Sequence, residues 1–192
     1  YYDNQTYWWR KNYSVERVYD PSDVTKYQDT RTDFEFNTSN RQIAKEQRLL
    51  SDGTRLSTYY KYPTDYTSIS TGPVVEMATT KHMRNVPVEV FNTVTKSGVE
   101  RVVSGTFNAF SKINNNIFLT RSDAIEANQS IPIASFKISS PDLVKDPTYY
   151  KYKFSYPDFD AIGNPLGVQK AGDINSRFIW GYSGALPIAR VE

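Results

Sequence analysis

The chain has 192 residues, a net charge of +2 and a mean hydropathy of −0.59, with fifteen tyrosines, ten phenylalanines and three tryptophans. The absence of cysteine excludes disulfides, thiolate metal sites and a cysteine nucleophile. Charges of both signs are interspersed, so neither nucleic acid nor an acidic membrane is an expected partner. No apolar run approaches the ~20 residues of a membrane span. We expect one β-rich domain, 1–192, that forms a section of a larger protein.

Aromatic and β-branched residues at alternate positions predict strands along most of the chain. In one such run Phe34 and Phe36 share a face, while Asp33 and Glu35 share the other. A short helix is expected at 73–83, because Pro73 suits a first helical turn. Strands are expected at 14–19, 31–37, 42–50, 55–62, 86–95, 99–110, 117–120, 134–138, 149–156, 178–182 and 188–192. Short strands at regular spacing predict an all-β protein.

The Asp52-Gly53 pair lies between two strand-like runs and predicts a β-hairpin, with positive φ at both central positions of its turn. The competing interpretation is a helix over 43–50, whose central residues are good helix formers. Further turns are expected at 96–98 and 114–116, from their serine, glycine and asparagine residues.

A five-residue sequence, Thr-Tyr-Tyr-Lys-Tyr, occurs at 58–62 and again at 148–152. Each copy is soon followed by a proline and an acidic residue. We interpret the copies as two strands in equivalent places of a degenerate repeat. Chance is the alternative explanation, because the chain is rich in tyrosine.

The segment 159–166, Phe-Asp-Ala-Ile-Gly-Asn-Pro-Leu, resembles the tyrosine–aspartate (YD) repeat of the RHS family. Those repeats read roughly tyrosine, aspartate, two variable residues, glycine, and asparagine or arginine. The segment 178–182, Phe-Ile-Trp-Gly-Tyr, followed by Leu-Pro-Ile-Ala at 186–189, is similar to a segment common in RHS-like proteins of Bacteroidetes. The resemblance spans most of 30–191, and its C-terminal end carries nearly all the specificity. Phe159 departs from the usual tyrosine, and only this turn fits the repeat well.

The resemblance implies a fold, a location and a role. The fold is a long twisted ribbon of antiparallel hairpins that spirals into a shell or a stacked sheet. The location is a large secreted or cell-surface bacterial protein. The role is encapsulation or protein–protein association, with no catalysis in the repeats. Open sheet edges would then contact other protein chains or the rest of the parent chain.

Asp160, Gly163 and Asn164 are candidate turn residues, because glycine supplies a conformation that other residues resist and aspartate binds backbone amides. Asp158 and Asp160 also match the start of a calcium loop, but its third ligand position falls on Ile162, which has no side-chain oxygen. Turn capping is therefore favoured, and neither a metal nor a cofactor is expected. The two carboxylates as acid and base of a glycan-active enzyme form the remotest hypothesis, since nothing else marks a site.

His82 is the only histidine, and no G-x-S-x-G nucleophile motif accompanies it. We expect it to be exposed at the end of the short helix.

The candidate aromatic binding surface consists of Trp8, Trp9, Trp180 and Tyr182, because exposed rings can stack on sugars. Packing between strands is the favoured interpretation of the rings. The favoured function is therefore a non-catalytic β-repeat scaffold, and a carbohydrate-binding module is the alternative.

Overall fold

The computed structural model describes residues 10–192, which form an all-β protein as predicted: one twelve-stranded antiparallel sheet with a short α-helix. The strands are β1 (Tyr13–Asp20), β2 (Asp23–Phe36), β3 (Ile43–Leu49), β4 (Arg55–Lys61), β5 (Glu89–Lys96), β6 (Val99–Ile113), β7 (Asn116–Ile125), β8 (Ile131–Pro132), β9 (Tyr150–Ser155), β10 (Gly167–Lys170), β11 (Ser176–Gly181) and β12 (Leu186–Val191). The helical elements are η1 (Pro63–Asp65), α1 (Pro73–Thr79), η2 (Ile133–Ser135) and η3 (Tyr182–Gly184), of which only α1 is α-helical. In the described part of the chain, no helix has the length and apolar character needed to cross a membrane.

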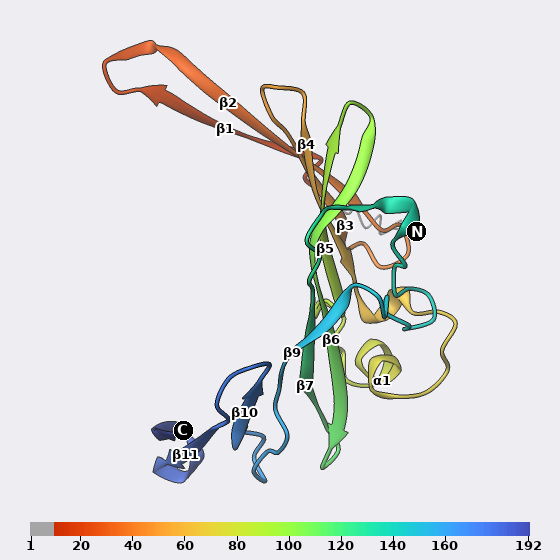
Figure 1. Ribbon diagram of the computed structural model, residues 1–192, viewed down its shortest axis with the longest axis vertical. Helices are drawn as coiled ribbons and strands as arrows, with labels where there is room; N and C mark the ends of the chain where they lie inside the picture. The colour runs from red at the N-terminus through yellow and green to blue at the C-terminus, as the bar shows by residue number, and fades with distance from the viewer. Residues whose placement is uncertain (1–9) are drawn as a thin grey trace, which may run out of the picture.

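The sheet is a nearly unbroken meander in which most strands pair with the next strand along the chain (Figure 1). The exception is β8, which pairs with β6, so that β9 lies beside β7. Ser97 and Gly98 both have positive φ and join β5 to β6 in a two-residue turn. Asn114 and Asn115 join β6 to β7 in the same way. Both turns lie where the sequence predicts them.

The β3–β4 hairpin is confirmed, and the helix alternative for its first strand is wrong. Its turn differs from the prediction, because Gly53 has a φ of 79° whereas Asp52 is not among the residues with positive φ. The N–H of Gly53 donates to the carbonyl of Leu50, and the N–H of Leu50 donates to the carbonyl of Thr54. The loop is therefore the three-residue type with glycine in the left-handed position. Asp52 caps it by accepting the N–H of Thr54 at 2.9 Å.

One face of the central strands carries the hydrophobic core. The period of two is clear in β5, where Glu89, Phe91 and Thr93 are buried and the residues between them are half-buried. The segments 63–80 and 131–149 contribute apolar side chains to the same cluster and so cover this face. The buried members of the cluster are Tyr66, Val74, Val88, Phe91, Val102, Phe107, Ile131, Phe136 and Tyr150.

The helix is shorter than the predicted 73–83 and ends at Thr79. It begins at Pro73 as expected, and it buries Val74 and Met77, which lie on one face of the helix. His82 is exposed, as predicted, and has a φ of 54°. A residue in this left-handed conformation cannot continue a right-handed helix, so the chain turns back toward β5.

The strand expected at 134–138 is wrong. Pairing with β6 is limited to Ile131 and Pro132, after which the chain forms η2. Pro132 has no N–H to extend the ladder, which accounts for the short strand. Phe136 is buried against the sheet. The apolar alternation of this stretch therefore reflects a covering loop that packs on the core.

The two copies of Thr-Tyr-Tyr-Lys-Tyr do not occupy equivalent places. The first copy lies at the end of β4, where Tyr59 stacks on Phe91 with ring centroids 4.8 Å apart. The second copy leads into β9, where Tyr150, one position later in the motif, is buried in the core. Tyr149, at the same motif position as Tyr59, also packs against the core. The first copy nevertheless lies at the end of its strand and the second at the start of its strand, so the interpretation as equivalent strands is wrong for this structure.

Candidate functional site

The turn at 160–164 is held by the side chain of Asp160. One carboxylate oxygen accepts the N–H groups of Ile162 and Asn164, at 3.0 and 2.8 Å. The other accepts the side-chain amide of Asn164 at 3.0 Å. Burial acts to raise the pKa of Asp160, but these hydrogen bonds outweigh it and leave the pKa below its ordinary value. Asp160 therefore caps the turn as an ionised carboxylate.

The same turn joins two distant parts of the sheet. Gly163 has a φ of 98°, and a Cβ at this position would lie 2.8 Å from the ring of Phe118 in β7. Phe159 stacks on Phe118 with ring centroids 4.7 Å apart. The side-chain amide of Asn164 also donates to the carbonyl of Gly184, at 2.7 Å. The predicted turn residues thus connect the end of β9 both to β7 and to the loop before β12.

The geometry of Asp158 and Asp160 does not suit an acid–base pair. Asp158 forms an ion pair with Arg177, and Asp160 is occupied by amide donors. A general acid of a glycosidase needs a raised pKa, whereas hydrogen bonds hold the pKa of Asp160 low. Within residues 10–192 no group of three or more histidine, aspartate or glutamate side chains is placed to hold a metal ion.

The candidate aromatic surface is only partly described. Trp8 and Trp9 lie outside the described residues. Trp180 is half-buried, and its indole N–H donates to the carbonyl of Pro165 at 2.9 Å. Tyr182 is 77% exposed. Tyr182 is therefore the described member of this set whose ring is open to a ligand, while Trp180 helps to fix the turn described above.

A fully buried carboxylate, which we did not single out from the sequence, lies in the core. Glu89 of β5 accepts hydrogen bonds from the N–H and the hydroxyl of Ser139, at 2.9 and 2.7 Å, and from the hydroxyl of Tyr150 at 2.9 Å. The hydroxyls of Ser139 and Tyr66 also lie 2.8 Å apart. Burial raises the pKa of Glu89, which the hydrogen bonds from Ser139 and Tyr150 partly offset. This network fastens the covering loop to the sheet.

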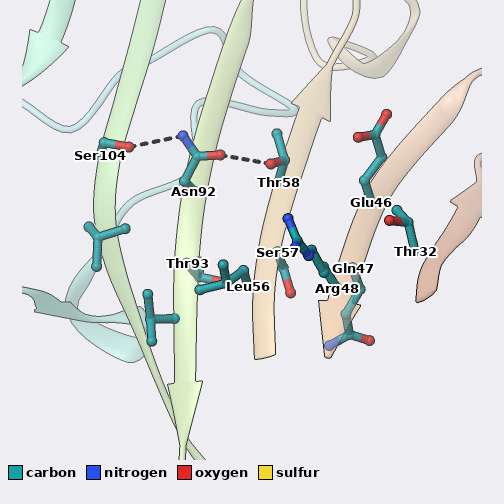
Figure 2. A pocket seen from close by; sticks show the side chains of 12 residues that line it. Thr32, Glu46, Gln47, Arg48, Leu56, Ser57, Thr58, Asn92, Thr93 and Ser104 are labelled. Carbon is teal, nitrogen blue, oxygen red and sulfur yellow. Dashed lines mark hydrogen bonds between the residues drawn. The ribbon is translucent and has the colours of Figure 1, made fainter. Parts of the chain in front are cut away.

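The open face of the sheet holds a shallow groove of about 440 Å³ across β2 to β6 (Figure 2). At its centre Asn92 accepts the hydroxyl of Thr58 at 2.8 Å and donates to the hydroxyl of Ser104 at 2.9 Å. Glu46 and Arg48 supply the charges of the lining. The groove offers hydroxyls, amides and two charges, an arrangement that can bind a polar surface but contains no nucleophile paired with a base.

The β1–β2 arm, the two-stranded part of the sheet up to residue 31, projects from the body (Figure 1). On one face the guanidinium of Arg17 lies 3.8 Å from the ring centroid of Tyr27 and forms two hydrogen bonds with Asp29, at 2.7 and 2.8 Å. Arg31 lies 4.3 Å from the ring centroid of Tyr13. Cation–π contacts and ion pairs of this kind order the exposed face of the arm.

Comparison with known proteins gives no match to any family model, curated protein or solved structure.

Proposed function

We propose that the chain is a non-catalytic β-sheet scaffold, a section of an RHS-like secreted or cell-surface bacterial protein that holds other chains through its sheet edges. The observation that carries this proposal is the single long meander, in which the side chains of Asp160, Glu89 and Asn92 all make contacts that hold the fold together. Asp160 caps a turn, Glu89 fastens a loop, and Asn92 bridges two strands. Within residues 10–192, these three side chains therefore support a structural role for the sheet.

The two outermost strands supply the edges. β1 and β12 each pair with one neighbour within the described residues, so the other side of each strand is open. Both carry exposed apolar side chains: Val15 and Val18 on β1, Leu186 and Ile188 on β12, each about half exposed or more. Unpaired backbone beside exposed aliphatic groups is a template for pairing with another chain.

Sedimentation velocity over a range of protein concentrations tests the proposal. We expect the chain to associate as its concentration rises, and the substitutions Val15→Lys and Ile188→Lys to reduce this association. The control is Ile174→Lys, which alters an equally exposed residue in the loop between β10 and β11. A monodisperse monomer at every concentration would contradict the proposal.

A carbohydrate-binding module is the second candidate, and the exposed ring of Tyr182 favours it. The rings of Tyr13 and Tyr27 fit it less well, because an arginine of the chain already lies over each ring. Titration of the wild type and of Tyr182→Ala with a broad panel of polysaccharides, followed by tryptophan fluorescence, separates the candidates. We expect no response from either protein. A response that is lost in Tyr182→Ala would establish the carbohydrate function in place of the scaffold.

A further inference from the structure

A notch separates the β1–β2 arm from the neighbouring hairpin. β3 pairs with β2 only from Thr32 onward, and the arm then diverges from the β3–β4 hairpin (Figure 1). Between them lies a space of about 730 Å³, lined by residues 28–31 of β2 and by the hairpin tip at 49–52. The sheet therefore has an internal open edge in addition to its two outer edges.

The backbone of β2 faces this notch with unpaired groups. The N–H of Phe34 donates to the carbonyl of Asn12, on the β1 side. Alternate residues of an antiparallel strand direct their N–H and C=O groups to opposite edges, so the odd-numbered residues of β2 direct theirs away from β1. Among the described residues no strand pairs with Tyr27, Asp29 or Arg31 on that side. An edge about five residues long is thus available to another strand.

In the described part of the chain, the lining of the notch holds one cation without a carboxylate partner, Arg48, and one carboxylate without a cation partner, Asp52, which accepts the N–H and the hydroxyl of Thr54 in its own loop. Asp29 is paired with Arg17 of β1, and Arg31 with Asp33 of β2. Arg48 reaches only the hydroxyl of Thr30, at 3.5 Å, and within residues 10–192 it has no carboxylate at ion-pair distance. Leu49 is 53% exposed beside it. A strand that enters the notch would therefore meet a cation and an aliphatic side chain.

We propose that the notch binds an extended segment of a partner protein that carries a carboxylate opposite Arg48 and adds to the open edge of β2 as a further strand. Backbone hydrogen bonds to Tyr27, Asp29 and Arg31 would supply the affinity, as in other cases of strand addition. A carboxylate of the segment would pair with Arg48, and an aliphatic side chain would cover Leu49. This inference rests on the proposed function, because it names a place where the scaffold holds its partner.

The probe is an acetylated and amidated heptapeptide of alternating valine and threonine with one central glutamate. Amide hydrogen exchange of residues 10–192 is followed by NMR at a protein concentration where the chain is monomeric. At millimolar peptide we expect the amides of Tyr27, Asp29 and Arg31 to exchange more slowly. Those of Gln28 and Thr30 should not change, because they already face β1.

Matched probes and variants separate the backbone from the charge. A peptide N-methylated at alternate positions should give no protection. A lysine in place of glutamate should weaken binding roughly two- to five-fold, the scale of an exposed ion pair. The substitution Arg48→Gln should remove this preference between the two peptides. Arg55→Gln, which changes an exposed arginine of β4 outside the notch, should preserve it.

Three results would overturn the inference. One is the absence of protection at 27, 29 and 31 at saturating peptide. Another is slow exchange of these amides in the free monomer. The third is protection that appears on raising the protein concentration alone, which would assign the edge to a second copy of the chain. Self-association through β1 and β12 is measured separately by sedimentation, so failure of the notch proposal is distinct from failure of the scaffold proposal.

Discussion

Glu89 and Ser139 are fifty positions apart in the chain, yet the N–H and the hydroxyl of Ser139 both donate to one carboxylate oxygen of Glu89. Glu89 stands on β5 with its side chain fully buried, and Ser139 belongs to the loop that covers the core. Buried carboxylates are costly unless each oxygen has a partner, and the hydroxyl of Tyr150 occupies the other oxygen. The pair therefore sets where the covering loop meets the sheet.

This pair predicts a pH dependence of stability. Burial raises the folded-state pKa of Glu89 above its ordinary value of 4.5, so the unfolded chain loses the proton first as the pH rises. Stability contributed by the protonated form is present below pH 4.5 and is lost as the pH rises through the raised pKa. In Glu89→Gln, which cannot ionise, this loss is absent. The free energy of unfolding of the wild type minus that of the variant should therefore decrease from pH 4 toward neutrality.

Urea denaturation at several pH values measures this difference, and the subtraction removes the contribution of aspartates that lose stability in acid. Ser139→Ala is a companion variant, because it removes one of the three donors while the carboxylate remains. We expect it to lower the free energy of unfolding by about 1–3 kcal/mol, the cost of an imperfectly satisfied buried carboxylate. A difference between wild type and Glu89→Gln that stays constant or increases with pH would contradict the assignment.

The elements that local sequence determines were predictable, while those set by tertiary packing were not. Asn114-Asn115 and Ser97-Gly98 are turns because their own residues accept positive φ, and both were found from the sequence. The apolar alternation around Phe136 predicted a strand, but the segment is a loop. A loop that packs on a sheet can bury alternate side chains as a strand does, so the pattern does not distinguish the two. The helix ended before 83 because His82 adopts the left-handed conformation, which its residue type does not reveal.

The turn at 160–164 gives a second prediction. We expect Gly163→Ala to lower the free energy of unfolding by about 2–4 kcal/mol, because the positive φ of this position is unfavourable for a residue with a Cβ, and because the added Cβ would collide with the ring of Phe118. Gly172→Ala is the matched control, since Gly172 has a φ of 68° with nothing within 4 Å of the added Cβ. It should cost only about 1 kcal/mol. Denaturant unfolding of both variants measures the difference.

A Phe118→Ala background isolates the steric part of this cost. With the ring removed, Gly163→Ala should cost no more than Gly172→Ala costs in the wild type. The coupling between the two substitutions then reports the contact between turn and strand. Equal losses for Gly163→Ala with and without the ring would show that backbone strain alone requires glycine at this position.

The candidate site was less predictable than the fold, for a physical reason. Asp160 and Gly163 could be assigned to a turn because their partners are their own neighbours in sequence. Glu89 shares a strand face with Phe91, a pattern that is visible in the sequence and indicates a buried carboxylate. Its donors come from Ser139 and Tyr150, however, and no local pattern connects these to β5. Partners across a fold can be found only once the strands are in register.

Ser57 and Thr93 give the last prediction, because they are cross-strand neighbours with opposite hydrogen-bonding states. Both are almost fully buried. The hydroxyl of Thr93 donates to Glu100 at 2.6 Å, whereas the hydroxyl of Ser57 has no partner within the described residues. An unsatisfied buried hydroxyl lowers stability, so Ser57→Ala should leave the free energy of unfolding unchanged or raise it by up to about 1 kcal/mol.

The matched variant Thr93→Val keeps the shape of the side chain but removes a donor to a carboxylate, and it should lower the free energy of unfolding by about 1–3 kcal/mol. Thermal and urea unfolding of the two variants measures the contrast, and a loss for Ser57→Ala as large as that for Thr93→Val would mean that Ser57 has a partner in solution.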